Sequence, residues 1–361
     1  MRRGAVTNLY LSLMTYANHS IYHYQIYTLE KAEFSLKSEF EKMGINVNEP
    51  TISLGIITRC ISFIAWLMFH RPQIVHSHLS KANFIGPFSS FMSRIPIRIV
   101  THHTIKSGYS FFIRNAIYMT NNICTAKTFV SQTVMESFSH WRQTKFDRVI
   151  YNGIDVMELS NKKYLSQTIS IRQEFKLQNK YIITTVGRLI PEKNHELTLK
   201  IIKKLLFKIK DVHLLIVGAG PYRNKIKLLM KQLGISSFVS FTGFRENVSQ
   251  IISQSDLILN PSLREGFSMT MLEALACGTP FIGSALPQNE ECITSGFDGI
   301  LIDSSQCEEY VSYIQKIYEN KQFYQSIVIN GKKRVADFEI NSIQSQYEAL
   351  YKLCVKNREK I

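Results

Sequence analysis

The chain has 361 residues, of which 45% are hydrophobic and 20% charged. This balance excludes a disordered or fibrous protein and predicts a globular one with two domains. The formal charge is +15, and the excess is densest early: residues 1–150 carry 16 Lys and Arg against 7 Asp and Glu, and residues 151–361 carry 27 against 21. Such a surface favours anionic partners, including acidic lipid and phosphorylated small molecules. Because no basic run is interleaved with aromatic residues, nucleic acid is not an expected partner.

The cysteines and the chain start indicate an intracellular protein. Six cysteines lie far apart and form no C-x-x-C pair, so we expect free thiols in a reducing compartment. Met1-Arg-Arg-Gly4 leads into polar and aromatic residues instead of an apolar core, and no signal peptide is expected. The sequence therefore predicts a cytoplasmic location.

Short apolar runs alternate with helical patterns, which is typical of an α/β protein with parallel sheets. In the first half we expect a helix over residues 31–43, ended by Gly44. The expected strands are residues 24–29, 73–78, 96–103, 125–130 and 148–151. His78 and His103 end two of these strands, and parallel sheets bind ligands at the carboxyl ends of their strands.

Residues 52–69 are largely apolar but contain Arg59. The segment falls short of the roughly 20 apolar residues of a spanning helix and carries a charge near its middle, so it is not expected to cross a membrane. We expect a helix that packs on the sheet through one stripe: Leu54, Ile57, Ile61, Ile64 and Met68. Contact with the inner face of the plasma membrane stays open as an alternative, because the other face is also apolar, with Phe63, Trp66 and Phe69.

The second half repeats the alternation of strands and helices. A turn signal at Asn152-Gly-Ile-Asp155 comes first, and the domain boundary is expected within residues 153–178. A short helical segment is expected near residues 171–175, and a final helix near residues 343–355. The expected strands are residues 181–186, 213–217, 239–242, 257–260, 281–283 and 300–302.

Two carboxylates, Glu265 and Glu273, stand eight residues apart. Glu265 follows the loop Asn260-Pro261-Ser262, and Glu273 lies inside an apolar helix. At 1.5 Å rise per residue they are about 12 Å apart along the axis, which suits a ligand with hydroxyl groups at both ends and a diphosphate between them. The helix start between them offers unpaired N–H groups and a positive dipole end. The pattern indicates a nucleotide-sugar pocket, against the alternative of two solvated glutamates.

A second loop carries positive charge. Val186-Gly-Arg-Leu189 and Pro191-Glu-Lys-Asn-His195 follow a strand and open a helix. Arg188 and Lys193 are suited to hold a diphosphate and stabilise it as a leaving group, although solvated side chains on an ordinary turn would give the same pattern. Gly218-Ala-Gly220 and Phe241-Thr-Gly-Phe244 end further strands and are weaker signals, because simple tight turns explain them equally well.

The histidines at the strand ends allow two interpretations. His78 and His103 are either ligand-site residues, with His103 placed where a sugar hydroxyl could reach it, or histidines of the core or rim whose hydrogen bonds the protein itself satisfies. His102 is expected on the face opposite His103, because side chains alternate along a strand. No D-x-D triplet occurs and the histidines lack ligand spacing, so no metal site is expected.

Together these residues resemble the GT-B glycosyltransferases, and specifically glycosyltransferase family 4. The match includes I-V-H-S-H and V-I-Y-N-G-I-D in the first half, and V-G-R-L-x-x-x-K-N-H, V-G-x-G, F-x-G, E-G-F-x-x-x-x-L-E-A-x-A-C-G-x-P and G-x-L-I in the second. The resemblance implies two Rossmann-like domains facing a cleft: an acceptor-side domain at residues 1–155 and a donor domain at residues 156–340. Residues 341–361 would form a helix that crosses back to the first domain.

The resemblance also implies the chemistry. Retaining transfer from a nucleotide sugar is expected, with no cofactor and no metal, to a saccharide or lipid-linked saccharide of surface-polysaccharide or glycolipid synthesis. Arg188 and Lys193 would bind the donor diphosphate and Glu273 the ribose hydroxyls. Glu265 and His103 would line the donor sugar and complete the catalytic set. The remaining donor-binding residues would be Gly187, Gly218, Gly220, Phe244, Gly266, Phe267 and Ser268.

Two departures from the family pattern affect this interpretation. Met1-Arg-Arg-Gly-Ala5 begins at the loop that usually follows the first strand, so that strand is expected to be missing. The family's G-G-x-P-E loop is replaced by Pro287-Gln-Asn-Glu-Glu291, with Glu291 at the glutamate position. Two rival interpretations stay open: a GT-B epimerase or phosphorylase of sugar nucleotides, and a catalytically degenerate chain that binds nucleotide sugar or a partner enzyme.

Overall fold

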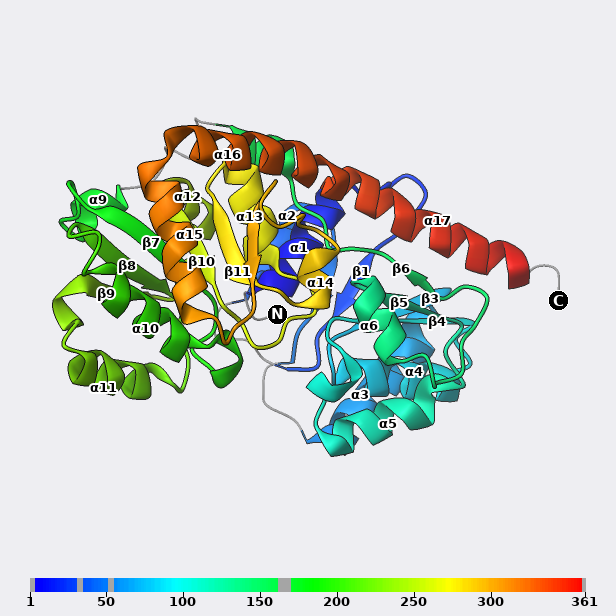
Figure 1. Ribbon diagram of the computed structural model, residues 1–361. Coiled ribbons are helices and arrows are strands. Elements are labelled where there is room, and N and C mark those ends of the chain that lie inside the picture. The colour runs from blue at the N-terminus through cyan, green and yellow to red at the C-terminus, as the bar shows by residue number, and fades with distance from the viewer. Residues whose placement is uncertain (1–3, 31–34, 51–54, 162–169, 359–361) are drawn as a thin grey trace. The chain divides into compact units, whose positions relative to one another are not determined.

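The structure is a computed structural model that describes residues 4–30, 35–50, 55–161 and 170–358 (Figure 1). The chain divides into two compact units, Met1–Gly153 with Ile340–Ile361, and Ile154–Glu339. Every strand pair within the named sheets is parallel, which confirms the predicted α/β class.

The first unit contains two sheets. A two-stranded sheet pairs β1 (Gln25–Tyr27) with β2 (Asn46–Asn48), and the second strand was not expected from the sequence. A four-stranded sheet has the order β3 (Ile74–His78), β4 (Ile97–His102), β5 (Ala126–Phe129) and β6 (Arg148–Val149). The strands expected near residues 24–29, 73–78, 96–103, 125–130 and 148–151 are thus confirmed, with shorter bounds. The expectation of a missing first strand concerns the chain start, and residues 1–3 lie outside the described residues.

Helices cover these sheets. They are α1 (Ala5–Thr15), α2 (Lys37–Lys42), α3 (Ile56–His70), α4 (Ala82–Met92), η1 (Lys106–Gly108), α5 (Phe111–Asn121), α6 (Gln132–Ser137) and α17 (Ile340–Arg358). The C-terminal helix α17 is part of this unit, because Ile343, Tyr347 and Leu350 are buried in one core with Leu13 of α1 and Ile99 of β4. None of the helices in the described ranges is long and apolar enough to cross a membrane.

The apolar helix α3 packs through a different face from the one predicted. Phe63 and Leu67 are its buried residues, whereas Ile57 and Ile61 of the predicted packing stripe are 73% and 61% exposed. Met68, also of that stripe, is exposed, and Leu54 lies outside the described residues. The predicted stripe is therefore wrong: most of it faces solvent.

The reason is an aromatic partner that the helix pattern does not reveal. The ring of Tyr27 in β1 lies 4.6 Å from that of Phe63 and 5.3 Å from that of Trp66, measured between centroids. Aromatic pairs bury large areas at favourable ring geometry, so the side of α3 with Phe63 and Trp66 turns inward. Phe69, at the end of the helix, remains 84% exposed.

The second unit holds a six-stranded sheet in the order β12-β11-β10-β7-β8-β9. All six strands expected in this half are confirmed, and their bounds are β7 (Tyr181–Val186), β8 (Val212–Val217), β9 (Val239–Gly243), β10 (Leu257–Asn260), β11 (Phe281–Ser284) and β12 (Ile300–Ile302). The order runs outward in both directions from β7 and β10, which lie side by side. A parallel sheet of this kind binds ligands at the carboxyl ends of the two strands where its order reverses.

Two helical layers cover this sheet. Right-handed crossovers put the helices after β7 and β8 on one face and those after β9 and β10 on the other. Accordingly α10 packs between α11 and α15, and α13 between α12 and α16 (Figure 1). The helices are α7 (Val156–Ser160), α9 (Ile171–Glu174), η2 (Pro191–Lys193), α10 (His195–Leu205), α11 (Arg223–Leu233), η3 (Ser236–Phe238), α12 (Val248–Ser253), α13 (Met269–Cys277), α14 (Pro287–Glu290), α15 (Cys307–Glu319), α16 (Lys321–Val335) and η4 (Ala336–Phe338).

Candidate active site

The candidate site lies where the strand order of the second unit reverses. The loop after β7 carries Arg188 and Lys193, and the loop after β10 carries Glu265. Because β7 and β10 are parallel neighbours, both loops leave the sheet at the same edge. The topology thus joins two motifs that stand more than 70 residues apart in the chain.

Two ion pairs tie these loops together. Lys193 Nζ lies 2.5 Å from Glu265 Oε1, with both side chains largely buried. Arg264 Nη2 lies 2.9 Å from Glu192 Oε1, and the backbone N–H of Leu263 donates to the Glu192 carbonyl at 2.8 Å. The two charged residues that the sequence analysis assigned to the diphosphate and to the donor sugar therefore contact each other directly.

Glycines make the approach of neighbouring loops possible. Gly187 and Gly218 have φ of 153° and 138°, which disfavours any residue with a Cβ. A Cβ on Gly218 would stand 1.9 Å from the Gly187 carbonyl oxygen, and a Cβ on Gly220 would stand 2.5 Å from that of Leu189. A Cβ on Gly187 would stand 2.9 Å from Lys193 Cε. The G-x-G turn is therefore a tightly packed support for the loop that carries Lys193.

The start of α13 adds oriented backbone donors. Ser268 caps the helix by accepting from the N–H of Met271 at 3.4 Å, and Asn260 Nδ2 donates to its hydroxyl at 3.4 Å. Gly266 and Phe267 precede this cap, and Phe267 is buried with its ring 5.5 Å from that of Phe338. Such a helix start favours an anion through its N–H groups and dipole.

Glu273 lies in the second turn of α13. It makes no hydrogen bond or ion pair with any residue in the described ranges, and its side chain is half-buried. Burial raises its pKa to about 7. A carboxylate held without a partner beside a helix start is available to a ligand with paired hydroxyl groups.

Two further predicted residues lie at the ends of strands in this unit. Arg188, directly after Gly187, is exposed, and its guanidinium makes no ion pair within the described ranges. Phe244 follows β9 and is 45% exposed, behind Gly243 with φ of 74°. Both side chains stand at the carboxyl edge of the sheet.

His103 belongs to the first unit, directly after β4. Burial lowers its pKa to about 4, and neither ring nitrogen has a hydrogen-bond partner within the described part of the chain. Its ring lies 5.8 Å from that of His78 and 6.4 Å from that of Tyr10. His102 has a different environment, stacked on Phe129, as expected from alternation along the strand.

His78 is half-buried and hydrogen-bonded within the first unit. Its Nδ1 lies 2.6 Å from the Tyr10 hydroxyl, and its ring lies 4.1 Å from that of His76. His76 in turn bonds to the hydroxyls of Thr101 and Tyr351 at 2.7 and 2.8 Å. The contact with Tyr10 agrees with the interpretation of His78 as a histidine whose hydrogen bonding is satisfied within the protein.

Sequence reasoning missed three residues of the site. Glu192 and Arg264 form the second ion pair between the loops, and Gln288 Nε2 donates to the Glu265 carbonyl at 2.9 Å. Gln288 comes from the segment that departs from the family loop. No local pattern indicates these contacts, because their partners are distant in sequence. Within the described residues, no group of three or more His, Cys, Asp or Glu side chains could hold a metal ion.

Comparisons with known proteins cover most of the chain. Residues 42–158 match the family model "Glycosyltransferase Family 4", and residues 166–334 match "Glycosyl transferases group 1". The chain is 26% identical over 278 residues to the UDP-Gal:alpha-D-GlcNAc-diphosphoundecaprenol alpha-1,3-galactosyltransferase of Escherichia coli, covering 72% of this chain and 70% of that one. It is 24% identical over 317 residues to the capsular polysaccharide biosynthesis glycosyltransferase CapM of Staphylococcus aureus, covering 81% and 80%.

Solved structures are similar over almost the full length. Anabaena Alr3699/HepE in complex with UDP and glucose matches with a TM-score of 0.84 and 21% identity, covering 98% of each chain. A glycosyltransferase from Rickettsia africae matches with a TM-score of 0.78 and 17% identity, covering 98% of this chain and 96% of that one. At these identities the likeness shows the fold alone.

Proposed function

Because the chain belongs to the GT-B glycosyltransferases, with a family 4 domain followed by a group 1 domain, we propose that it is a retaining, metal-independent hexosyltransferase. It moves a sugar from a nucleotide-sugar donor to the hydroxyl of a saccharide or lipid-linked saccharide in polysaccharide or glycolipid biosynthesis. The observation that carries this proposal is the Lys193–Glu265 pair at the reversal of strand order. The pair brings together the side chain proposed to bind the diphosphate and the side chain proposed to bind the sugar.

The donor is a uridine diphosphate sugar. The support is the set of Alr3699/HepE structures, which contain UDP, UDP with glucose, and UDP-glucose, and the E. coli relative named for UDP-Gal. In this chain the diphosphate meets Arg188 and Lys193, and the N–H groups at the start of α13 supply further donors. Glu273 accepts from the ribose hydroxyls.

The Lys193–Glu265 pair changes partners when the donor binds. In the free protein each charge neutralises the other across 2.5 Å. The donor diphosphate attracts Lys193, and the released Glu265 carboxylate accepts from the sugar hydroxyls. The pair thus keeps both side chains oriented without a ligand, so that less reorganisation is needed during the reaction.

Bond breaking depends on charge stabilisation. The bond between the anomeric carbon and the diphosphate oxygen breaks, and negative charge grows on the leaving group next to Arg188 and Lys193. The acceptor oxygen forms its bond to the same carbon from the same face, and its proton passes to the departing diphosphate. His103, whose ring nitrogens lack protein partners, is proposed to line the sugar.

Transfer assays test this proposal. The wild-type chain is incubated with UDP-sugars and a panel of lipid-linked and free saccharide acceptors, with and without EDTA. Lys193→Ala should reduce transfer at least 100-fold, since removing one group that stabilises the leaving group costs about this much. Glu273→Ala should also reduce transfer strongly, because it removes the proposed ribose contact and weakens donor binding. Lys200→Ala, on the exposed side of α10 and paired with Glu196, is the matched control and should retain activity.

Three results would overturn the proposal. Wild-type rates in Lys193→Ala would refute the site, loss of activity in EDTA would refute metal independence, and an inverted product would refute retention. Incubation with donor alone distinguishes transfer from epimerisation, which needs no acceptor. Peripheral contact with an anionic membrane is also proposed, on the basic charge and exposed apolar residues of the first unit.

A further inference from the structure

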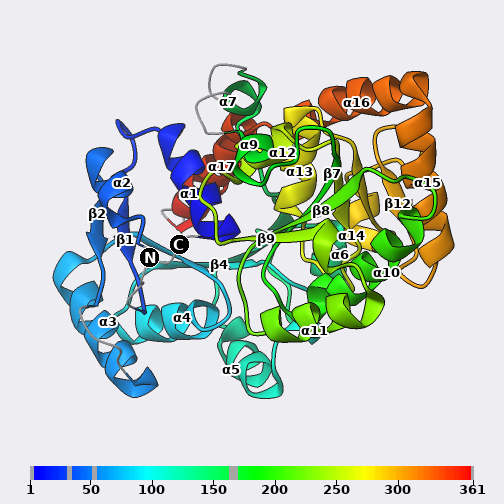
Figure 2. The same cartoon turned by 90° about the vertical axis from the view of Figure 1, so that its left-hand side faces the viewer.

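Three helices of the first unit end at one edge of its sheet. The parallel strands β3, β4 and β5 each follow a helix directly: α3 ends four residues before β3, and α4 and α5 end five residues before β4 and β5. Their ends therefore lie where the strands begin, at the opposite edge from His103. α4 packs between α3 and α5 (Figure 2).

Each of these helix ends presents two large apolar side chains to solvent. They are Met68 and Phe69 on α3, Phe91 and Met92 on α4, and Tyr118 and Met119 on α5, all more than half exposed. A globular protein seldom gathers so many on neighbouring ends without a partner. We call these six residues, with Arg71 and the arginine pocket described below, the amino-edge patch.

The stretch of chain that builds this patch has no acidic residue. Between Glu49 and Glu136 the sequence contains eight Lys and Arg and not one Asp or Glu. Carboxylates that would repel an anionic surface are therefore missing from all three helices and the strands between them. In this stretch, every charged side chain near the exposed apolar ones is therefore positive.

Two arginines occupy positions that glycine usually fills. Arg71 and Arg94 follow the ends of α3 and α4 with φ of 46° and 57°, in the left-handed region. Glycine or asparagine is common after a helix end because this region costs conformational energy for other residues. Arg71 and Arg94 both adopt this conformation, and each lies next to the exposed apolar pair of its helix.

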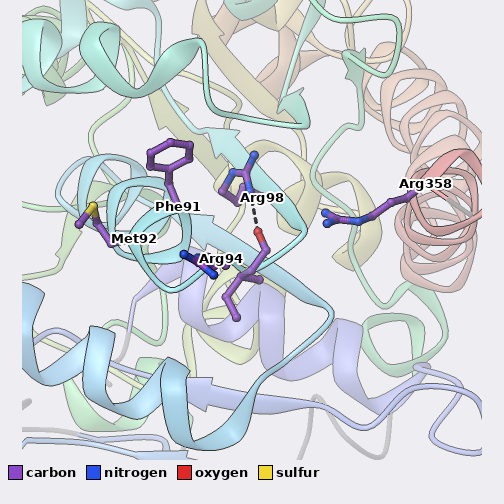
Figure 3. A pocket seen from close by; sticks show the side chains of 6 residues that line it. Phe91, Met92, Arg94, Arg98 and Arg358 are labelled. Atoms are coloured by element: carbon purple, nitrogen blue, oxygen red, sulfur yellow. Dashed lines mark hydrogen bonds between the residues drawn. The ribbon is translucent and has the colours of Figure 1, made fainter. Parts of the chain in front are cut away.

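The arginine pocket adjoins the end of α4. Its volume is about 460 Å³, and it is lined by Phe91, Met92, Arg94, Ile95, Arg98 and Arg358 (Figure 3). Arg98 is held in place, because its Nε donates to the Ile123 carbonyl at 2.6 Å and its Nη1 to the Ile95 carbonyl at 2.5 Å. Arg358 reaches in from the last turn of α17 (Figure 3). Three guanidinium groups thus share a pocket that no carboxylate lines among the residues the structure describes.

We propose that the amino-edge patch docks on an anionic phospholipid bilayer, with a lipid phosphate in the arginine pocket and the apolar pairs inserted among the acyl chains. Guanidinium groups bind phosphate oxygens well. Exposed apolar side chains next to cations are typical of surfaces that insert at the headgroup region of a membrane. A protein partner could also cover these apolar side chains, but three helices without an acidic residue and a pocket of three arginines favour a dense layer of phosphates. This inference specifies the membrane contact proposed above and does not depend on the donor chemistry.

Vesicle sedimentation with the full chain tests the inference. The protein is mixed with vesicles of phosphatidylglycerol and phosphatidylcholine, or of phosphatidylcholine alone, at low salt. Wild type should sediment with the mixed vesicles only. The variant Arg94→Gln/Arg358→Gln should bind about 30-fold more weakly, since each cation near the surface contributes about fivefold to binding. Both side chains are exposed and make no hydrogen bond or ion pair within the described ranges, so folding should be retained.

Two more variants distinguish the patch from general charge. Met92→Ser/Met119→Ser removes apolar contact without changing charge and should also weaken binding about tenfold or more. The matched control is Leu228→Ser/Lys231→Gln on α11 of the other unit, where an exposed apolar residue lies beside a lysine. It should bind mixed vesicles like the wild type.

Several outcomes would overturn the inference. They are no binding of wild type to mixed vesicles, equal binding to neutral vesicles, or equal losses in the α11 control and the patch variants. The thermal shift given by a UDP-sugar is measured on the same samples. If it persists while vesicle binding fails, the docking surface is refuted and the proposed donor site stands. If the shift is missing while vesicles bind, the reverse holds.

Discussion

Replacing Glu273 by glutamine should make the free protein more stable and should weaken its binding of the donor. The carboxyl group is half-buried and has no hydrogen-bond or ion-pair partner among the described residues. Its pKa is about 7 because burial disfavours the charged form. A glutamine of the same shape carries no charge, so it avoids this cost.

The magnitude follows from the pKa. In the unfolded chain a glutamate ionises near 4.5, and in the folded protein near 7. Because the pKa is raised on folding, the contribution of this carboxyl group to stability is fully present below pH 4.5 and is lost as pH rises towards 7. Each pH unit in this window costs about 1.4 kcal/mol, or about 3 kcal/mol in all. Glu273→Gln should recover that amount, which corresponds to a rise in Tm of about 6–12 °C for a unit of this size.

Scanning calorimetry of wild type and Glu273→Gln between pH 4 and pH 8 measures the effect. The two curves should meet near pH 4.5 and separate up to pH 7. Glu309→Gln, on the exposed side of α15, is the control and should follow the wild type. Binding of a UDP-sugar should tighten up to about tenfold from pH 6 to pH 8 in the wild type and be weak and independent of pH in Glu273→Gln. The reasoning would be refuted if the difference in stability between Glu273→Gln and wild type were no larger at pH 8 than at pH 4.5.

Three other predictions concern packing and buried charge. Gly218→Ala should lower stability by at least about 1–3 kcal/mol in urea unfolding and weaken donor binding, because its Cβ would meet a carbonyl oxygen at 1.9 Å. Lys127→Met should cost about 3–5 kcal/mol in the same assay, since Asp147, 2.9 Å from the Lys127 amine and equally buried, loses its counter-charge. His102 is fully buried, and burial lowers its pKa to about 3. The contribution of the neutral His102 ring to stability should therefore be present above pH 6.5 and be lost as pH falls towards 3. His102→Phe should recover about 2 kcal/mol of that loss at pH 5.

Each of these has a control or a contradicting result. Gly234→Ala also adds a Cβ at positive φ but meets no atom within 4 Å, so a loss equal to that of Gly218→Ala would exclude the steric explanation. Adding Asp147→Asn to Lys127→Met should restore part of the stability, and no recovery would argue against a charge effect. An acid transition that is unchanged in His102→Phe would assign the acid sensitivity to other groups.

The sequence alone was sufficient for the elements and the loops of this protein. The strands β7 to β12 were predicted to within a residue or two at each end, because short apolar runs bounded by turn residues carry that information locally. The start of α13 was predicted only to lie between Glu265 and Glu273, and the structure places it after Ser268, whose hydroxyl caps the helix. The site residues were proposed from such motifs and from the family resemblance.

Tertiary structure decided which of these residues touch. Lys193 was predicted to bind the diphosphate and Glu265 the sugar of one donor. The structure adds that they form an ion pair, because the strand order puts β10 beside β7. The buried face of α3 was predicted wrongly, since both faces are apolar and the choice depends on distant partners: Tyr27 packs against Phe63, and Ile85 and Ile95 belong to the same cluster. The pKa of Glu273 likewise depends on burial by its surroundings. Local spacing determines a strand, a turn or a cap, whereas pairing, burial and charge environment depend on segments that meet only in the folded chain.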